Sequence, residues 1–458
     1  MDYLADVCTR WASCPQTAMK ALVVGMGVSG LSIARYLAAE GATVLAVDSR
    51  REPPCLAATA AISGVKAQSN TNIATWQKSD FDSYDLVAKS PGIPLSHITA
   101  PVEKITGDAA LFADAWRRNP PNTTLLAVTG TNGKSTVTEL SAQLCTAAGR
   151  RAEAIGNIGE PLLDAWQRWQ QTAAPDVAVA ELSSFQLETA SNFTSDIAAV
   201  LNISPDHLDH HSDMATYTTA KAQLYHHAAR RVVNADDTAV TAMTTSPDVT
   251  FSATERTTAA WHLTADAIVG DARFALTEMA APPHSALAAL ALTDGLSLDT
   301  TARRQALANF SRLPHRQQIV SHIDNVTYIN DSKATNVASA CFALKQLLGN
   351  AVIIAGGDGK GQDFTRLATE AQGRVRLAVL LGRDALQLQT AFTNVGIATQ
   401  QAKNMPEAVF IATQAATAGD TVMLSPACSS LDMYTNYGAR GDAFISSCLN
   451  MEHRCATQ

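Results

Sequence analysis

The sequence predicts an α/β fold of three domains, and three observations lead to that prediction. The chain has 458 residues, and a prior of about 150 residues per domain favours three domains over one. Two separate glycine-rich loops each follow a short apolar run and precede a helical pattern. The last third of the chain alternates strand and helix patterns again. We place the three domains at residues 1–107, 108–312 and 313–458.

The composition indicates a globular protein that acts on small molecules. Hydrophobic residues make up 47% of the chain, charged residues 17%, and the net charge is −8. This acidic balance argues against nucleic acid or an anionic membrane as a partner. No apolar stretch approaches the roughly 18 residues of a membrane-spanning helix, and Asp2 and Asp6 interrupt the region where a secretory signal has its apolar core. We therefore expect a cytoplasmic monomer, whose eight scattered cysteines are reduced and mostly buried.

The first domain is predicted to be Rossmann-like. An apolar run at 21–24 leads into Gly25-x-Gly27-x-x-Gly30, a helix pattern follows, and a second strand pattern ends at Asp48. In this strand–turn–helix–strand setting, with an acidic residue after the second strand, the glycines are a nucleotide-binding fingerprint. An NAD-dependent oxidoreductase would use such a unit, but that class leaves the second glycine-rich loop unexplained.

The second glycine-rich loop, in TTLLAVTGTNGKST, is typical of a phosphate-binding loop. Gly130 and Gly133 let backbone N–H groups face a nucleoside triphosphate, Lys134 supplies a cation, and the Ser135 hydroxyl is a Mg²⁺ ligand. The helix pattern that starts after the loop adds a positive dipole end. The loop is shorter than the common form, because Val128 stands where the first glycine is expected. We predict a P-loop-type central ATPase domain.

Three more side chains of the central domain are candidates for a Mg²⁺ site. Glu181 ends one strand pattern and His207 ends the next, which predicts a carboxylate and an imidazole at neighbouring strand ends. Lys221 lies in a helical pattern, where most lysines are solvated, and it would ligate a metal only as a carbamate. His210 and His211 are expected at the surface.

The third domain is also predicted to be Rossmann-like, with a parallel, doubly wound sheet. Strand patterns alternate with helix patterns at 325–331, 351–361, 377–384 and 421–427. Three polar turns, INDSKATN, GGDGKG and SPACSSLDMYTNYGARG, follow or end these strands and carry Lys360, Tyr437 and Arg440. Polar turns at the carboxyl edge of one sheet favour a binding site. Arg316, just before these strands, is expected to reach a γ-phosphate.

Eight segments, taken in order along the chain, resemble the Mur ligase family: VTGTNGKST, ELSSFQLE, NISPDHLDHH, AKAQLY, LPHR, NDSKATN, GGDGKG and LSPACSSLDMYTNYGARG. The resemblance covers nearly the whole chain from about Lys20, and GGDGK and SPACSSLD are most similar to the members that add D-glutamate. It implies domains that bind a UDP-sugar, ATP and the incoming amino acid, in that order. The implied small-molecule substrates are UDP-N-acetylmuramoyl-L-alanine, glutamate and ATP, and the implied metal ion is Mg²⁺.

The resemblance also implies a role for particular residues of this sequence. Lys134, His207 and Lys221 match catalytic positions. The positions that match UDP-substrate contacts are Val28, Ser29, Asp48, Ser49, Arg50, Gly92 and Asn157. Those that match ATP contacts are Gly130, Thr131, Asn132, Gly133, Lys134, Ser135, Thr136, Arg316 and Asp331. Mg²⁺ is implied to lie on Ser135, Glu181, His207 and a carbamylated Lys221. The glutamate pocket is implied to contain Thr335, Lys360, Ser430, Leu431 and Tyr437, the last where the family has a phenylalanine.

The implied reaction is ATP-dependent amide synthesis in cytoplasmic peptidoglycan precursor formation. The γ-phosphate activates the carboxylate of the UDP-substrate as an acyl phosphate, and the glutamate amine then displaces phosphate. His207 or a carboxylate takes the amine proton, and the sequence leaves this choice open.

One segment departs from the family pattern. The family carries two asparagines that help to hold the adenine side of ATP, and Pro282 and Ser285 replace them here, with His284 as the nearby polar residue. Two alternatives stay open beside the D-glutamate ligase, and the missing asparagines favour the second of them. One is a related ligase that adds L-glutamate or extends folate, although the first glycine-rich unit argues against a folate ligase. The other is a non-catalytic nucleotide-binding paralogue.

Overall fold

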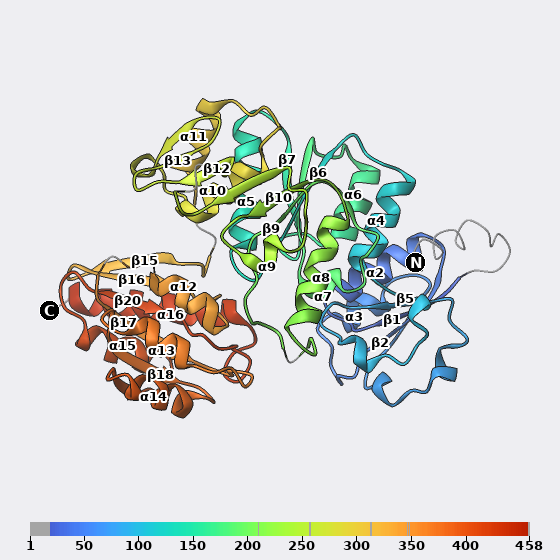
Figure 1. Cartoon of the computed structure of the whole chain (residues 1–458). Coiled ribbons are helices and arrows are strands. Elements are labelled where there is room, and N and C mark those ends of the chain that lie inside the picture. Colours follow the sequence, from blue (N-terminus) through green and yellow to red (C-terminus); the bar gives the residue numbers. More distant parts are fainter. Residues whose placement is uncertain are drawn as a thin grey trace. The chain divides into compact units, whose positions relative to one another are not determined.

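The structure is a computed structural model that describes residues 19–208, 210–255, 258–311, 314–345, 347 and 349–456 (Figure 1). The chain divides into two compact units, Met1–Ile203 with His210–Phe310 and Ser204–Asp209 with Ser311–Gln458. The first unit contains two β-sheets and the second unit contains one. The predicted three-domain α/β fold is confirmed. In the described part of the chain, no helix has both the length and the apolar character that a membrane crossing requires.

The N-terminal sheet has five parallel strands in the order β3-β2-β1-β4-β5. Its strands are β1 (Lys20–Val24), β2 (Thr43–Val47), β3 (Val65–Gln68), β4 (Leu86–Lys89) and β5 (Ile105–Gly107), and its helices include α2 (Val28–Ala39) and α3 (Leu56–Ala60). The helix α4 (Asp108–Arg118) follows β5 directly. A Cβ on Gly30 would lie 1.8 Å from the carbonyl oxygen of Gly25. The third glycine of the fingerprint is therefore needed for the close approach of α2 to the turn after β1.

The central sheet has nine strands in the order β14-β13-β12-β11-β10-β9-β6-β8-β7. They are β6 (Thr124–Thr129), β7 (Ala152–Gly156), β8 (Val177–Glu181), β9 (Thr194–Val200), β10 (His227–Asn234), β11 (Val249–Ser252), β12 (Trp261–Leu263), β13 (Ala267–Val269) and β14 (Arg273–Ala275). The seven strands β6 to β12 all pair in parallel with their neighbours in this group, whereas β13 pairs antiparallel with both β12 and β14. The sequence predicted small strands and loops for 238–282, and the described part of that segment contains the strands β11 to β14, of three or four residues each, together with two short helical turns at 238–241 and 276–278.

The helices of the central domain begin with α5, which starts where the phosphate loop ends. They are α5 (Lys134–Ala147), α6 (Leu162–Gln171), α7 (Ser184–Leu187), α8 (Met214–His226), α9 (Thr238–Thr241), α10 (Pro283–Leu292) and α11 (Thr300–Ala308). α10 is apolar all round and its residues from Ser285 to Leu292 are buried, as expected for a helix enclosed by its domain.

The C-terminal sheet has six strands in the order β15-β16-β20-β17-β18-β19. They are β15 (Gln318–Ile323), β16 (Val326–Asn330), β17 (Ala351–Gly356), β18 (Val375–Leu381), β19 (Ala398–Gln401) and β20 (Thr421–Leu424). Five of them are parallel, but β15 pairs antiparallel with β16. The prediction of a wholly parallel sheet is wrong at this edge, because Asp324 and Asn325 form a tight turn with positive φ angles of 50° and 61° that reverses the chain.

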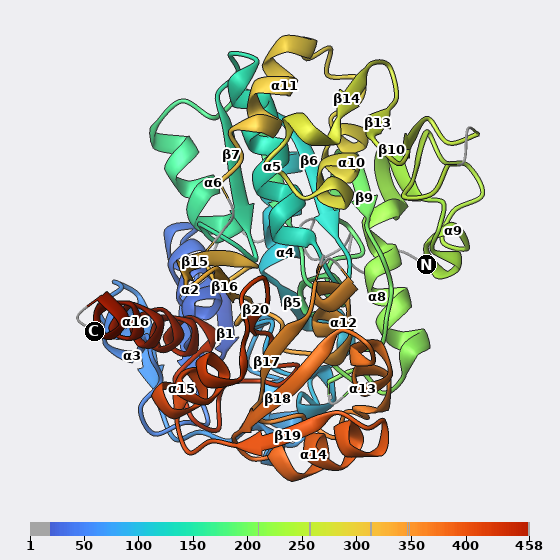
Figure 2. The same cartoon turned by 90° about the vertical axis from the view of Figure 1, so that its left-hand side faces the viewer.

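Helices cover both faces of the C-terminal sheet (Figure 2). Ile353 and Ala355 of β17 share a core with α12 (Val337–Lys345), α13 (Thr365–Ala371) and α14 (Ala385–Asn394), whereas Val352 and Ile354 share one with α15 (Met405–Ala415) and α16 (Tyr437–Ala456). Alternate residues of a strand point to opposite faces, so a strand that is apolar throughout packs against two layers of helices.

The described cysteines are free thiols, and four of the five are buried: Cys145, Cys341, Cys428 and Cys448. Burial raises the pKa of Cys145 to about 11. The expectation of mostly buried thiols is confirmed for these residues, and their reduced state stays a prediction.

Candidate active site

The phosphate loop lies between the end of β6 and the start of α5. Gly130 and Gly133 have φ angles of 153° and 82°, and a Cβ on Gly130 would lie 3.0 Å from the Leu201 Cβ atom. Asn202, after β9, holds the loop through its carbonyl, which accepts from the Thr131 N–H at 2.9 Å, and its side chain, which accepts from the Asn132 N–H at 2.8 Å. The loop is therefore a fixed backbone turn that excludes larger side chains at Gly130.

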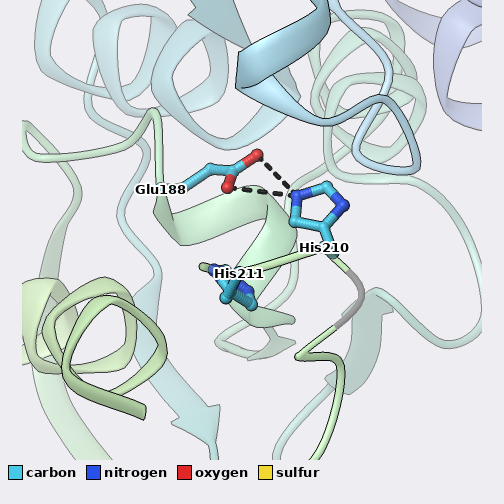
Figure 3. Close-up of side chains that lie close together, drawn as sticks. All are labelled: Glu188, His210 and His211. Atoms are coloured by element: carbon cyan, nitrogen blue, oxygen red, sulfur yellow. Dashed lines mark hydrogen bonds and ion pairs between the residues drawn. The ribbon is translucent and has the colours of Figure 1, made fainter. Parts of the chain in front are cut away.

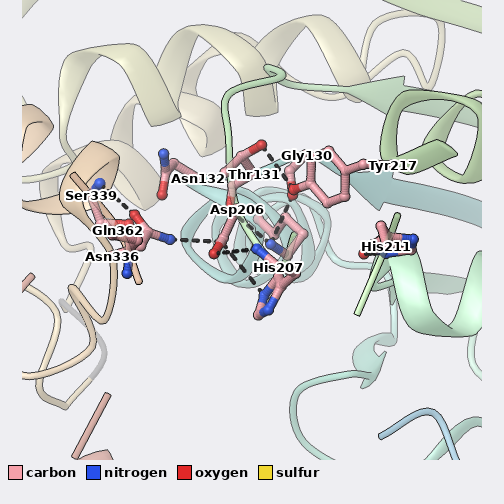
Figure 4. A network of polar contacts seen from close by, with 12 residues as sticks. Gly130, Thr131, Asn132, Asp206, His207, His211, Tyr217, Asn336, Ser339 and Gln362 are labelled. Carbon is pink, nitrogen blue, oxygen red and sulfur yellow. Dashed lines mark hydrogen bonds and ion pairs between the residues drawn. The ribbon is translucent and has the colours of Figure 1, made fainter. Parts of the chain in front are cut away.

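Lys134 lies at the first position of α5 and folds back over the loop. Its ammonium donates to the carbonyl oxygens of Gly130, at 2.8 Å, and Thr131, at 3.0 Å. The Thr131 hydroxyl lies 3.0 Å from the hydroxyl of Tyr217, which is on α8 (Figure 4). A cation held at the mouth of the loop is what a triphosphate requires.

Glu181 is buried at the end of β8, the strand next to β6, and is 1% exposed. One of its carboxylate oxygens, Oε1, accepts from the Asn157 amide at 2.6 Å. The other, Oε2, is buried and has no hydrogen-bond partner among the described residues. Because an unpartnered buried carboxylate oxygen is costly, it fits a Mg²⁺ ion, which takes oxygen ligands.

Ser135 and Lys221 converge on the same edge of the central sheet. Ser135 is 1% exposed in the first turn of α5. Lys221, on α8, is also 1% exposed, and its amine donates to the Gly130 carbonyl at 2.9 Å and lies 3.3 Å from the Thr129 hydroxyl. A hydroxyl, a carboxylate and a buried amine beside the phosphate loop form a donor set that fits Mg²⁺ and a carbamate.

Glu139 is a residue of this site that the sequence analysis missed. It is partly buried on α5, and burial, together with the negative charge of Glu181, raises the pKa of its carboxyl. Its position four residues after Ser135, on the same face of the predicted helix, was the signal available in the sequence.

His207 belongs to a different compact unit from the other three predicted Mg²⁺ ligands, and it lines a cavity of that unit. It belongs to the segment Ser204–Asp209, which is grouped with the second unit, and its Nε2 lies 3.5 Å from Asp206 Oδ2. Asp206 also accepts from the Asn336 amide at 2.7 Å (Figure 4). The structure thus brings Ser135, Glu181 and Lys221 together within the first unit, and a metal role for His207 stays a prediction.

The predicted UDP-substrate residues lie in two places. Six of them follow β1, β2 and β4 of the N-terminal sheet: Val28, Ser29, Asp48, Ser49, Arg50 and Gly92. Asn157 instead follows β7 of the central sheet, where it donates to Glu181. Asp48 accepts from the Met26 N–H at 2.7 Å and from the guanidinium of Arg50 at 2.6 and 2.9 Å. Burial opposes ionisation of Asp48, but these bonds outweigh it and hold the pKa of the carboxyl below its usual range.

The second unit contains a cavity of about 540 Å³ at the carboxyl edge of its sheet. All five residues predicted for a glutamate pocket line it: Thr335, Lys360, Ser430, Leu431 and Tyr437. The sequence analysis did not assign three further cavity residues, Lys333, Gln362 and Arg366. The ammonium of Lys333 lies 4.2 Å from the centroid of the Tyr437 ring. Gln362 accepts from the Val337 N–H and donates to the Gly359 carbonyl, both at 3.0 Å, and so ties α12 to the GGDGKG turn.

Arg316 and Asp331, the predicted ATP contacts of the second unit, are close in that unit. Asp331 follows β16 and is 7% exposed, and its Oδ1 accepts from the Gln317 N–H at 3.1 Å. The residue after Arg316 is thus held against Asp331, which fixes the segment that carries the arginine.

Glu188, His210 and His211 form a compact cluster in the first unit (Figure 3). The expectation that both histidines lie at the surface is wrong: their side chains pack on the Phe185 ring, with centroids 4.0 and 5.6 Å away. His210 Nε2 lies 3.1 and 3.2 Å from the two Glu188 oxygens. The buried ammonium of Lys89 also pairs with Glu188. Because Lys89 already neutralises this carboxylate, the cluster is a buried ion-pair network and does not suit an added divalent cation.

Comparison with known proteins assigns the chain to a family. Three family models match consecutive parts of it: the Mur ligase MurD-like N-terminal domain (residues 19–105), the Mur ligase middle domain (128–280) and the Mur ligase glutamate ligase domain (315–428). The chain belongs to the Mur ligase family. Members of this family use ATP and Mg²⁺ and act on small-molecule substrates, so the predicted family and the coarser predictions about cofactors and partners are confirmed.

Two relatives of this Mur ligase carry the name UDP-N-acetylmuramoylalanine–D-glutamate ligase. The protein of Methylobacillus flagellatus is 39% identical, covering 94% of this chain and 97% of the relative. The protein of Thiobacillus denitrificans is 40% identical, covering 93% and 95%.

Two solved structures have a similar fold. The UDP-N-acetylmuramate-alanine ligase MurC of Thermotoga maritima has a TM-score of 0.61 at 18% identity and covers 94% of this chain and 100% of its own. E. coli FolC has a TM-score of 0.56 at 19% identity and covers 76% and 93%. At these identities the likeness concerns the fold alone.

The two positions at which the family has asparagines near the adenine of ATP lie at the start of α10. Pro282 precedes the helix, Pro283 begins it, and no side chain of the described residues caps its first turn. Ser285 is buried in that turn. The segment therefore offers no side-chain amide at the two positions where the family has asparagines.

Proposed function

We propose that this Mur ligase joins D-glutamate to UDP-N-acetylmuramoyl-L-alanine in peptidoglycan precursor synthesis, by ATP-dependent amide-bond formation. The observation that carries the proposal is the 39–40% identity, over nearly the full length, to ligases whose name states this substrate pair. The cytoplasm, where such nucleotide-linked precursors are made, is the proposed location. We also propose that the domains end at residue 107, the last residue of β5, and at residue 312, which lies outside the described residues.

The phosphate loop is the proposed site of ATP. Its backbone turn and the ammonium of Lys134 would hold the phosphates, and the loop residues assigned to ATP are Gly130, Thr131, Asn132, Gly133, Lys134, Ser135 and Thr136. Arg316 and Asp331 are the proposed contacts from the second unit. Phosphoryl transfer needs little covalent help from a protein, so positioning and charge neutralisation by these groups account for most of the catalysis.

Ser135, Glu181, His207 and a carbamylated Lys221 are the proposed ligands of Mg²⁺. When bound, the ion neutralises charge on the phosphoryl group that is transferred. The unpartnered Oε2 atom of Glu181 supports its assignment. The burial of Lys221 beside the phosphate loop supports the carbamate, because an ammonium there would repel Mg²⁺, whereas the negative charge of a carbamate would be neutralised by the ion.

The reaction then proceeds in two steps. The γ-phosphate passes to the alanyl carboxylate of the UDP-substrate and forms an acyl phosphate, with Lys134 stabilising the charge on the phosphate oxygens. The neutral amine of glutamate attacks the acyl carbon, and the tetrahedral intermediate collapses with loss of inorganic phosphate. His207 or a carboxylate takes the amine proton, and both assignments remain proposals.

The cavity of the second unit is the proposed glutamate site. Glutamate carries two carboxylates, and Lys333, Lys360 and Arg366 place three cationic side chains around one cavity. Thr335 and Ser430 add hydroxyl donors, and Leu431 and Tyr437 add apolar surface for the methylene groups. The UDP-sugar is proposed to lie on the edge of the N-terminal sheet, against Val28, Ser29, Asp48, Ser49, Arg50 and Gly92, with Asn157 contributing from the central sheet.

The direct test is product analysis by mass spectrometry with UDP-N-acetylmuramoyl-L-alanine, D-glutamate, ATP and Mg²⁺. We expect a product larger than the UDP-substrate by one glutamyl residue, formed only when all four components are present. A folded protein that forms no such product would instead support a nucleotide-binding paralogue without catalytic activity. The absence of both adenine-side asparagines is the observation that favours this second candidate.

A further inference from the structure

Arg440 lies beneath the proposed glutamate site and has no assigned role. It is 2% exposed in the first turn of α16. Its guanidinium donates to the carbonyl oxygens of Ser332 at 2.8 Å, Cys428 at 3.0 Å and Gly356 at 3.4 Å, and its Nε donates to the Ser332 hydroxyl at 3.0 Å. One side chain therefore joins three separate polar turns.

These three turns carry all the residues assigned to glutamate. Ser332 is in the turn that holds Thr335, Gly356 starts the turn that holds Lys360, and Cys428 precedes Ser430 and Leu431. Tyr437 begins the helix that carries Arg440 itself. The Ser332 hydroxyl also donates to the Tyr437 carbonyl at 2.8 Å. Each residue assigned to glutamate binding is thus at most four positions along the chain from Arg440 itself or from a residue that accepts a hydrogen bond from Arg440.

The turns also approach each other closely. The N–H groups of Asp358 and Ser429 donate to each other's carbonyl oxygens at 3.0 and 2.8 Å. A Cβ on Gly357 would lie 2.1 Å from the Ser429 carbonyl oxygen and 3.3 Å from the guanidinium of Arg440. The guanidinium of Arg440 therefore lies directly against the point where two of the turns meet.

The charge of Arg440 is costly in this position. Burial lowers its pKa to about 10, and no carboxylate forms an ion pair with it in the described part of the chain. A cation near a helix N-terminus is also unfavourable, because that end of the helix is itself positive. Stability alone would favour a neutral residue here, whereas a site that receives two carboxylates gains from a nearby positive charge.

We propose that Arg440 is a positioning residue for the amino-acid substrate, which sets the spacing of the three turns and adds positive potential to the site. This inference rests on the proposed function, since the substrate is taken to be glutamate. A lysine cannot replace Arg440, because one ammonium cannot span four acceptors arranged around a planar guanidinium.

The test compares steady-state kinetics of the wild type and Arg440→Lys with each substrate varied in turn. We expect KM for D-glutamate to rise by about tenfold, from the loss of hydrogen bonds made by a charged donor, while KM for ATP and for the UDP-substrate changes by less than about twofold. Arg303→Lys is the matched control. Arg303 is 6% exposed and pairs with Asp271 in the central domain, so its variant should leave KM for D-glutamate unchanged.

A milder pair of variants covers the case in which Arg440→Lys does not fold. Ser332→Ala removes one acceptor of Arg440 and should raise KM for D-glutamate by about threefold. Ser321→Ala, at a buried serine of β15 whose hydroxyl has no partner among the residues described, should have no effect. An unchanged KM for D-glutamate in folded Arg440→Lys, or in Ser332→Ala if the lysine variant does not fold, overturns the proposal. A wild-type protein without D-glutamate-dependent activity would instead contradict the proposed function.

Discussion

Lys134 is the residue on which the proposed phosphoryl transfer depends most. Its ammonium donates to two carbonyl oxygens of its own loop, which keeps the cation at the loop mouth. We predict that Lys134→Ala lowers the rate of phosphate release by at least about 10²-fold, because a charge that stabilises the transferred group is lost. Lys66→Ala, at an exposed position of β3, is the control. Near-normal phosphate release from the Lys134 variant would remove this lysine from the mechanism.

Glu188 makes the stability of the first unit depend on pH. Burial opposes its ionisation, but the hydrogen bond with His210 and the charge of Lys89 outweigh it and hold the pKa of the carboxyl below its usual range. Such a group stabilises the folded state fully above its unfolded pKa, and this stabilisation is lost as the pH falls through the folded pKa. The free energy of unfolding should therefore be lower in the Glu188→Gln variant than in the wild type at neutral pH, and the difference should shrink in acid.

The measurement is urea unfolding of the wild type and Glu188→Gln at about pH 7 and about pH 4. Removing one partner of a buried pair costs about 3–5 kcal/mol, so we expect a large difference at the higher pH and a smaller one at the lower. Glu103→Gln, at an exposed position, should show little difference at either. A Glu188→Gln effect that is equal at both pH values would contradict the assigned ionisation.

The sequence predicted the site residues that belong to a motif. It did not predict those whose burial or contacts depend on how distant segments pack together. The phosphate-loop residues and the five residues of the cavity were named from sequence segments. The burial of His210 and His211 could not be, because it depends on the Phe185 ring and on Lys89, which is far away in the sequence. The contact of Asn157 with Glu181 likewise arises from the pairing of β7 with β8.

At the scale of elements, α10 is the helix whose sequence departs from the family pattern. Its first turn lacks both asparagines of the family pattern, and Ser285 is the replacement that lies within the helix. We predict that Ser285→Asn lowers KM for ATP by about fivefold, since one restored hydrogen bond contributes about 1 kcal/mol. Ser297→Asn, at an exposed position after the helix, is the control. An unchanged KM for ATP would show that this chain holds adenine by other contacts.

The buried parallel strands and their helices could be predicted, because each is a short apolar run or an amphipathic period. The short strands at the edges of the central and C-terminal sheets could not be located from the sequence. β12, β13 and β14 have three residues each, too few to establish an alternating pattern, and β15 has only two fully buried residues. Such strands form because a neighbouring strand offers unpaired backbone groups, which is a property of the assembled sheet.

At the scale of the whole molecule, the order of the motifs predicted the three-domain α/β fold, and the family models confirm it. What the order of motifs does not determine is the handedness of the amino acid. D- and L-glutamate have the same charge and size, so discrimination depends on how the residues of the cavity are spaced rather than on which residues they are. That spacing is the property we assign to Arg440.

The central claim is tested most directly by phosphate release with ATP, Mg²⁺ and UDP-N-acetylmuramoyl-L-alanine, run in parallel with D-glutamate, L-glutamate and no amino acid. The account predicts release that requires D-glutamate, which would also show that the altered start of α10 is compatible with ATP binding. Release with L-glutamate alone would keep the mechanism and contradict the substrate. A folded protein that releases no phosphate with either amino acid would contradict the assignment as a ligase.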